Sequence, residues 1–227
     1  PTTGKVTVNG VDVSEKTDEA KHMRHKVGMV FQYPEHQLFE ETIAEDIAFG
    51  PKNLGLDAEE VDRRVREAMA FVGLDYDTYA ERSPFHLSGG QMRRVAIAGV
   101  VAMEPDFLVL DEPSAGLDPF GREEIFDEII KLHKEKDVTV ILVSHNMEDI
   151  SRMANRLIVL DKGQIVLDGK PLDIFNHHRH VLQQVGVDVP PVSVLVESLR
   201  NRGLDVSNEL TVDDAVQAIL EGGQHVK

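Results

Sequence analysis

Short apolar runs rich in Val, Ile and Leu recur along the chain. Each is typical of a strand buried on both faces, and together they cover residues 27–31, 107–110, 138–143 and 157–160. Segments with helical periodicity separate these runs. Strands that alternate with helices predict an α/β fold with a mostly parallel sheet.

Three amphipathic helices are predicted between these strands. Residues 59–74 place apolar side chains on one face at spacings of three and four and end at Gly73. A second helix should follow Gly90 and end before Pro105, and a third should cover residues 122–136. The side chains expected to face inward are Val61, Val65, Ala68, Met69, Val72, Val95, Ala98, Val101, Ile125, Ile129 and Leu132.

Two segments have turn signals typical of antiparallel hairpins. Residues 5–9 alternate polar and apolar and end in the tight-turn pair Asn9-Gly10. Residues 160–170 repeat the pattern, with Lys162-Gly163 and Asp168-Gly169 as expected turns. An antiparallel β part should therefore accompany the parallel sheet.

The last part of the chain predicts a small helical module. Pro190-Pro191 opens one helix, and Thr211 with Asp214 forms a capping-box pattern before another. Their expected shared apolar faces consist of Val192, Leu195, Val196 and Leu199, and of Val212, Ala215, Val216, Ile219 and Leu220. About 50 residues fall below the usual size of a self-sufficient domain, so this module should dock on a partner.

The amino-acid composition argues against several classes of protein. The 227 residues are 41% hydrophobic and include no cysteine, which excludes disulfides and thiolate metal sites and suits the cytoplasm. No run approaches the roughly 18 apolar residues of a membrane span, and the first residues lack signal-peptide features, so any membrane role should be peripheral. The formal net charge of −16 argues against nucleic acid as a partner.

The string LSGGQ carries the most specific chemistry. Ser88 is a favourable N-cap, and Gly89 and Gly90 expose backbone N–H groups at the start of a predicted helix. Such a helix start favours an anion, which predicts a phosphate site. A lone SGG is also compatible with an ordinary loop that enters an ordinary helix.

Polar residues follow three of the apolar strands. Asp111 and Glu112 end the strand in FLVLDEP, His145 follows the strand in VILVSHN, and Gln32 follows VGMVF. The carboxyl ends of parallel strands meet at one sheet edge, where ligands bind in α/β proteins. Adjacent carboxylates there can hold Mg²⁺ and activate water, although each of these residues taken alone fits a structural role.

The ordered set of motifs resembles the nucleotide-binding subunit of the ABC transporter family over nearly the whole chain. LSGGQ matches the family signature, VLDE its Walker B segment and SAGLD its D-loop, while His145 and Gln32 match the switch histidine and the Q-loop glutamine. The stretch FQYPEHQLFEETIAEDIAFGPKNLG further resembles the ATPases of energy-coupling-factor importers for vitamins and cobalt-type ions.

The resemblance implies a role for each matching residue. Glu112 would be the general base for the attacking water and His145 would contact the γ-phosphate of ATP, while Asp111 and Gln32 would attend Mg²⁺. The signature residues would close over ATP held by the facing subunit of a head-to-tail pair; they are Ser88, Gly89, Gly90 and Gln91. The D-loop would include Ser114 and Asp118.

The resemblance also implies how the chain is organised and where it works. Residues 1–176 would form the ATPase domain, with a helical subdomain at about 40–104, and residues 177–227 a C-terminal dimerisation module. The partners would be a second ATPase subunit, a transmembrane coupling protein and a substrate-binding membrane subunit, at the cytoplasmic face of the membrane. Exposed apolar side chains at Leu38, Phe39 and Phe49, within residues 33–50, are expected to contact the transmembrane partner.

One motif of the family is missing. The G-x-x-x-x-G-K-[ST] phosphate loop does not occur in the 227 residues, and in the family it lies upstream of a segment like PTTGKVTVNG. The sequence is therefore interpreted as N-terminally truncated, and the chain as written is expected to be inactive alone. Two alternatives stay open: a non-catalytic partner of a second ATPase, and an ABC ATPase of DNA repair or translation.

Overall fold

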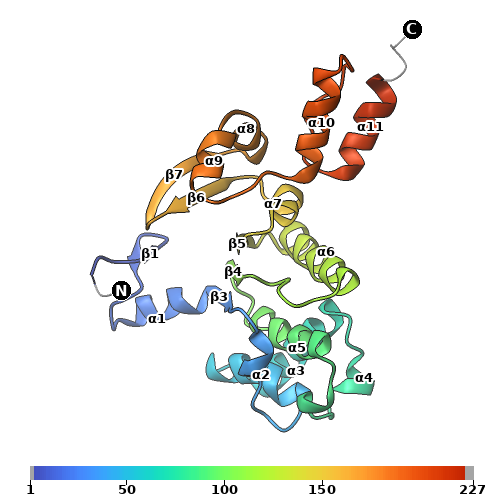
Figure 1. Cartoon of the computed structure of the whole chain (residues 1–227). Helices are drawn as coiled ribbons and strands as arrows, with labels where there is room; N and C mark the ends of the chain where they lie inside the picture. Colours follow the sequence, from blue (N-terminus) through green and yellow to red (C-terminus); the bar gives the residue numbers. More distant parts are fainter. Residues whose placement is uncertain (1–2, 223–227) are drawn as a thin grey trace. The chain divides into compact units, whose positions relative to one another are not determined.

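The computed structural model describes residues 3–222 of the chain. The chain divides between Val143 and Ser144 into two compact units, and each is considered by itself. Figure 1 follows the elements of both units along the sequence. The expected division after residue 176 separates an ATPase domain from an attached module and stays a prediction.

The first unit contains a three-stranded parallel sheet. Its strands are β3 (Val27–Val30), β4 (Phe107–Asp111) and β5 (Thr139–Val143), in the order β3-β4-β5. Val30 lies opposite Leu110, and Asp111 lies opposite Val143. The parallel pairing confirms the predicted α/β architecture.

The two faces of this sheet differ, which corrects one expectation. Val30, Leu108 and Leu110 are buried, whereas Met29 and Ile141 on the other face are 43% and 48% exposed. The apolar runs predicted burial on both faces, but the second face, where Val109 is half-buried, is only partly covered in this unit. Side chains therefore alternate between buried and exposed, as in a sheet covered on one side.

Helix α5 (Gly89–Val101) packs closely against β3. A Cβ atom added to Gly28 would lie 2.6 Å from Cγ1 of Val100, closer than real Cβ contacts allow. Glycine at this strand position therefore permits the approach of the helix.

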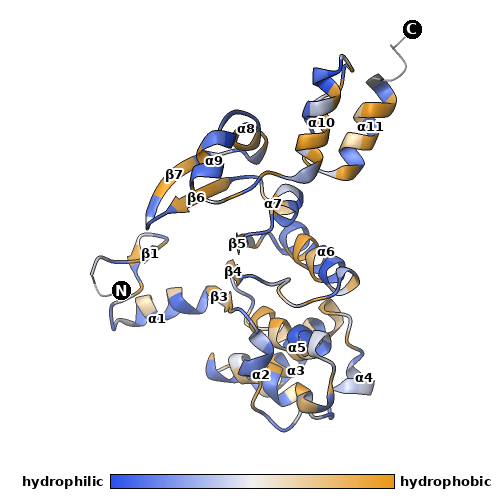
Figure 2. Ribbon diagram, in the orientation of Figure 1, coloured by the Kyte–Doolittle hydropathy of each residue, from blue (hydrophilic) through white to orange (hydrophobic). Residues whose placement is uncertain are grey.

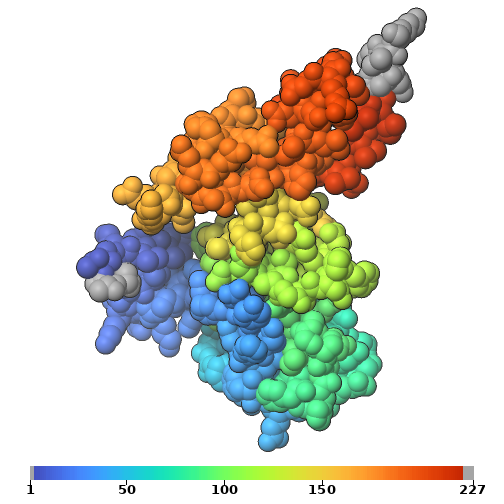
Figure 3. Space-filling model, viewed as in Figure 1, coloured from blue at the N-terminus to red at the C-terminus, as the bar shows by residue number. Residues whose placement is uncertain are grey.

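Helices also form a bundle of their own in the first unit. It consists of α2 (Ile43–Asn53), α3 (Ala58–Phe71), α4 (Tyr76–Tyr79) and α5, with the short helices η1 (Pro34–Gln37) and η2 (Pro84–His86). Helices α2, α3 and α5 pack against one another and form a closely packed body in Figure 3. The predicted inward-facing side chains of α3 and α5 are buried. The apolar periodicity thus identified both helices correctly.

Helix α6 (Pro119–Lys136) begins earlier than the predicted residue 122. Pro119 occupies the first turn, and the Asp118 carboxylate accepts a hydrogen bond from the Gly121 amide at 2.7 Å. Proline at the first turn is a start signal, but Pro119, Phe120 and Gly121 do not extend the apolar periodicity of the helix, which explains the late prediction. The expected core residues Ile125, Ile129 and Leu132 are buried.

The N-terminal hairpin is present as predicted. Strands β1 (Thr7–Val8) and β2 (Val11–Asp12) pair antiparallel across Asn9 and Gly10, whose φ angles are 49° and 85°. Two consecutive positive φ angles define the expected tight turn. Helix α1 (Asp18–His25), which follows, was not predicted because only Ala20 of its residues is buried.

The second unit contains α7 (Met147–Met153), β6 (Leu157–Asp161), β7 (Gln164–Gly169), α8 (Pro171–His177) and α9 (Arg179–Gln184). Strands β6 and β7 form an antiparallel hairpin across Lys162 and Gly163. The run at 157–160 was expected with the other sheet strands, and that expectation is wrong. Asp168 and Gly169 belong to β7 instead of forming a turn, because both pair with residues of β6.

Two C-terminal helices, α10 (Pro191–Asn201) and α11 (Val212–Gly222), pack side by side, and Figure 2 shows apolar positions on both. Their small core consists of Val196, Val206, Ala215 and Ala218. The predicted capping residue Thr211 accepts a hydrogen bond from the Asp214 amide at 3.2 Å. The expected apolar faces are only partly buried: Leu195, Val212, Val216 and Leu220 are exposed.

Among residues 3–222, no helix is both long enough and apolar enough to cross a bilayer.

Candidate nucleotide-binding site

Three of the predicted site residues lie at one edge of the parallel sheet. Gln32 follows β3, Asp111 ends β4, and Glu112 comes directly after it. Because β3 and β4 are parallel neighbours, their carboxyl ends are adjacent, and the Asp111 position is also paired with Val143 of β5. This is the edge at which α/β sheets bind ligands.

Glu112 has an unusual backbone conformation. Its φ angle is +49°, in the left-handed region that residues other than glycine rarely adopt. Its amide donates to the Val143 carbonyl at 2.9 Å, and its carbonyl accepts from the Ala115 amide at 3.1 Å. The backbone at Glu112 is thus fixed on both sides, by β5 and by the turn that follows. Unusual backbone conformations of this kind are enriched at functional sites.

His145 comes two residues after β5 and belongs to the second unit. Its side chain is exposed. The next residue, Asn146, caps α7 by accepting hydrogen bonds from the Glu148 and Asp149 amides. His145 therefore precedes a fixed helix start, and its role at the sheet edge stays a prediction.

The signature residues form the N-terminus of α5. Ser88 Oγ accepts a hydrogen bond from the Gln91 amide at 3.3 Å, and Gln91 Oε1 accepts one from the Ser88 amide at 3.1 Å. These reciprocal bonds are a capping box. Gln91 Nε2 also lies 3.4 Å from the hydroxyl of Tyr79, which joins the helix start to α4. Tyr79 was not singled out in the sequence, since no motif marks it.

Gly89 and Gly90 are open to their surroundings. Apart from adjacent residues and the backbone of α5 itself, no described heavy atom lies within 4 Å of a Cβ added at either glycine. Packing inside this chain therefore does not explain why both positions lack a side chain. Close approach of an external group to the helix start does explain it, because glycine leaves the amides accessible.

A hollow of about 280 Å³ adjoins this helix start. Its lining includes Ser88, Gly90 and Gln91 together with Asp118 and the exposed ring of Phe120. The structure thus brings the signature residues and the end of the SAGLD segment to one surface. Ser114, at the start of that segment, is half-buried and does not line the hollow.

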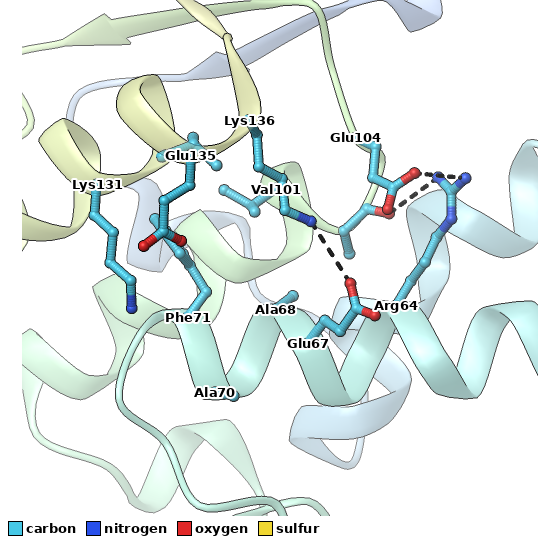
Figure 4. A pocket seen from close by; sticks show the side chains of 12 residues that line it. Arg64, Glu67, Ala68, Ala70, Phe71, Val101, Glu104, Lys131, Glu135 and Lys136 are labelled. Carbon is cyan, nitrogen blue, oxygen red and sulfur yellow. Dashed lines mark hydrogen bonds and ion pairs between the residues drawn. The ribbon is translucent and has the colours of Figure 1, made fainter.

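A second hollow, of about 290 Å³, lies between α3, α5 and α6 and is shown in Figure 4. Ion pairs cross it or flank it: Lys136 with Glu67 at 3.6 Å, and Arg64 with Glu104 at 2.9 Å. None of the predicted site residues lines it. We therefore place the candidate site at the sheet edge and the start of α5, although this hollow is slightly larger.

The donor groups at the sheet edge suit magnesium. Mg²⁺ binds carboxylate and amide oxygens and keeps several ligands as water or substrate phosphate, so one or two protein oxygens suffice. Asp111 and Gln32 offer such oxygens at adjacent strand ends. Groups of three or more His, Cys, Asp or Glu suited to a metal are absent from residues 3–222.

One residue that the sequence did not indicate connects these parts. Arg93 of α5 is 2% exposed and contacts both the segment after Gln32 and the turn after Glu112. Position 93 lies on the inward face of an amphipathic helix, where an arginine is unexpected. An arginine at an inward-facing helix position was therefore the feature of the sequence that could have indicated Arg93.

Comparison with known proteins identifies the family. The model of the ABC transporter family matches residues 1–115. The energy-coupling factor transporter ATP-binding protein EcfA2 of Clostridium perfringens is 54% identical over 97% of this chain and 78% of its own length. The EcfA2 protein of Caldanaerobacter subterraneus is 50% identical over 97% of this chain and 77% of its own length.

Two solved structures have the same fold. CbiO1 of Clostridium perfringens, part of the ABC transporter complex cbiONQ, aligns with a TM-score of 0.69 and 32% identity over 87% of this chain and 77% of that one. The ATP-binding cassette MJ0796, a dimer bound to ADP and Pi, aligns with a TM-score of 0.64 and 30% identity over 75% of this chain and 74% of that one. The chain belongs to the ABC transporter family of ATP-binding proteins, among those of energy-coupling factor transporters.

Proposed function

We propose that this chain supplies ATP binding and hydrolysis to an energy-coupling factor importer of small solutes, of the vitamin or metal-ion type. The observation that carries the proposal is the placement of Gln32, Asp111 and Glu112 at the carboxyl ends of adjacent parallel strands. The similarity to EcfA2 proteins over 97% of the chain supports the transport role. Assembly with membrane subunits is supported by the similarity to CbiO1, which is part of the ABC transporter complex cbiONQ.

The residues at the sheet edge suit phosphoryl transfer to water. Asp111 and Gln32 would hold Mg²⁺, which neutralises phosphate charge when it is bound. Glu112 would orient the attacking water and accept its proton, and His145 would donate a hydrogen bond to the γ-phosphate. Positioning and charge stabilisation dominate such reactions, so the fixed backbone of Glu112 serves the chemistry directly.

The start of α5 would act on ATP held by a second subunit. Its open glycine amides and positive dipole end favour a phosphate that approaches from outside the chain. Gln91 and Ser88, bonded to each other here, would exchange these bonds for phosphate contacts. Two subunits arranged head to tail would then share two sites.

The test compares the chain as printed with a form extended upstream to include a G-x-x-x-x-G-K-[ST] loop. The printed chain should bind Mg-ATP poorly and show no ATPase activity above background, because the loop supplies most β- and γ-phosphate ligands. The extended form should hydrolyse ATP. Its Glu112→Gln variant should keep ATP binding, lose on the order of 10²–10⁴ in rate and accumulate as a closed dimer.

Two outcomes would contradict the proposal. Robust hydrolysis by the printed chain, or full activity of the extended Glu112→Gln protein, would mean that the site is misassigned. An extended form that binds ATP without hydrolysing it would favour the alternative of a non-catalytic partner for a second ATPase.

A further inference from the structure

The side chain of Arg93 bonds to two segments that flank the candidate site. Its Nε and Nη2 atoms lie 3.2 and 3.3 Å from the two carboxylate oxygens of Glu35, in η1. Its Nη1 atom donates to the carbonyls of Pro113 and Ala115, at 3.1 and 2.5 Å. One guanidinium therefore joins α5, η1 and the turn after β4.

These contacts reach the site through the backbone. Glu35 follows Gln32 closely, and the intervening Tyr33 has a φ angle of +57° and accepts a hydrogen bond from the His36 amide at 3.1 Å. On the other side, the Ala115 amide donates to the carbonyl of Glu112. A shift of the guanidinium would thus displace both the segment after Gln32 and the backbone that carries Glu112.

Burial of the Arg93–Glu35 ion pair carries a desolvation cost, so the pair is a poor way to provide stability alone. The side chains of Arg93 and Glu35 are only 3% and 16% exposed. Apolar residues can often replace a buried ion pair without loss of stability, and its best-attested use is to fix a particular geometry. The planar fork of arginine suits this task, because its N–H groups point in fixed directions that lysine cannot reproduce.

We propose that Arg93 is a positioning residue for ATP hydrolysis, which holds the Gln32 and Glu112 segments in register with the signature helix α5. The inference rests on the proposed function of the sheet edge. Arg93 touches neither nucleotide nor water in this scheme. It acts through the carbonyls of Pro113 and Ala115 and through Glu35.

Arg64 provides a matched control within the same unit. It pairs with two carboxylates, those of Glu60 and Glu104, and bonds two backbone carbonyls, those of Ala102 and Met103. Its side chain is 14% exposed. Its partners lie on α3 and after α5, around the hollow in Figure 4. Within residues 3–222, the hydrogen bonds and ion pairs of Arg64 do not reach the turn after β4.

The experiment measures ATPase kinetics and thermal unfolding of the loop-extended protein and its Arg93→Lys, Glu35→Gln and Arg64→Lys variants. Arg93→Lys keeps the charge and loses the fork, so kcat should fall about 10- to 100-fold while KM for ATP changes less than about threefold. Glu35→Gln should lower kcat in the same direction. Arg64→Lys should leave both kinetic constants near the parent values.

The remaining outcomes separate this inference from the proposed function. A loop-extended parent protein without ATPase activity would contradict the proposed function itself. An active parent with Arg93→Lys and Glu35→Gln variants of unchanged kcat would overturn only the positioning role. If Arg93→Lys and Arg64→Lys lose activity and thermal stability equally, Arg93 contributes only to the stability of the fold, and the positioning role is overturned. If Arg93→Lys does not fold, the kcat of Glu35→Gln decides the matter.

Discussion

The rings of Phe39 and Phe49 meet edge to face, with centroids 4.9 Å apart and an interplanar angle of 89°. Both remain largely exposed, at 57% and 46%. The backbone beside Phe39 is fixed, because the Asp46 carboxylate accepts hydrogen bonds from the Phe39 and Glu40 amides at 2.9 Å. Two exposed aromatic side chains on a fixed backbone are suited to contact a partner.

Phe39→Ala should weaken assembly with a transmembrane partner by about tenfold or more and leave basal ATPase activity nearly unchanged. Co-purification from membranes measures assembly, and the loop-extended protein serves for activity. Leu38 was expected to share this surface, but it is 7% exposed and packs inside. Leu38→Ala should instead destabilise the fold by about 2–5 kcal/mol. Equal loss of assembly and activity in Phe39→Ala would mean that Phe39 only packs the fold.

The C-terminal helices should hold two copies of the chain together before ATP binds. Leu195 and Leu220 are 52% and 61% exposed on α10 and α11, so glutamate at both positions should shift the loop-extended protein toward monomer without unfolding it. Sedimentation without nucleotide measures this change. Val196→Ala, at a buried position of the same helices, should lower stability instead.

A dimer that resists the Leu195→Glu and Leu220→Glu changes would place the contact elsewhere. Truncation after Phe175, which also removes both helices, is a less specific test. Phe175 and Leu182 are 3% and 0% exposed on either side of that point. The cut would therefore open a buried cluster as well as remove the helices.

Glu60 should contribute to the acid limb of stability. Hydrogen bonds from Arg63 and then Arg64 lower the pKa of Glu60 from 4.5 to about 2. A lowered folded-state pKa gives stability that is present above the unfolded value and is lost as pH falls through the folded one. The contribution of Glu60 should therefore decline between about pH 4.5 and about pH 2.

Glu60→Gln should flatten this part of the stability profile, measured by urea unfolding across that range. Glu59→Gln, at the neighbouring exposed position of α3, is the control for a general change of charge. An NMR titration that places the Glu60 pKa near 4.5 would contradict the ion-pair account.

Gly28→Ala should destabilise the protein by about 1–3 kcal/mol, because the new Cβ would meet Val100 at 2.6 Å. Gly99→Ala on α5 is the control: there the nearest atoms lie 3.9 Å away, and alanine favours a helix by about 0.5–1 kcal/mol. The two substitutions should therefore change the urea midpoint in opposite directions. A neutral Gly28→Ala would show that α5 can move away from β3.

Local patterns predicted much of this fold. The spacing of Val61, Val65 and Ala68 identified α3, and the pairs Asn9-Gly10 and Lys162-Gly163 identified two tight turns. In each case the residues that form the pattern are close in sequence, and the element depends on interactions among those neighbours. The positions of Gln32 and Asp111 at the ends of apolar runs likewise predicted that both would lie at one sheet edge.

Properties that depend on distant segments were not predictable. The run at 157–160 has the composition of a buried strand, and only its pairing with β7 shows that it forms a hairpin. Leu38 sits in a polar loop, and its burial depends on packing that no local pattern encodes. Arg93 belongs to the same class, because its partners lie 58 and 20 residues away along the chain.

The positive φ angle of Glu112 opposes folding stability to the catalytic role proposed for this residue. A residue with a side chain in this conformation costs on the order of 1–3 kcal/mol, which glycine would not incur. A chain with glycine at position 112 would thus be more stable but would lack the Glu112 carboxylate. Searches for thermostable variants of this protein should therefore recover substitutions at position 112 that raise folding stability and remove the ATP hydrolysis proposed for this site.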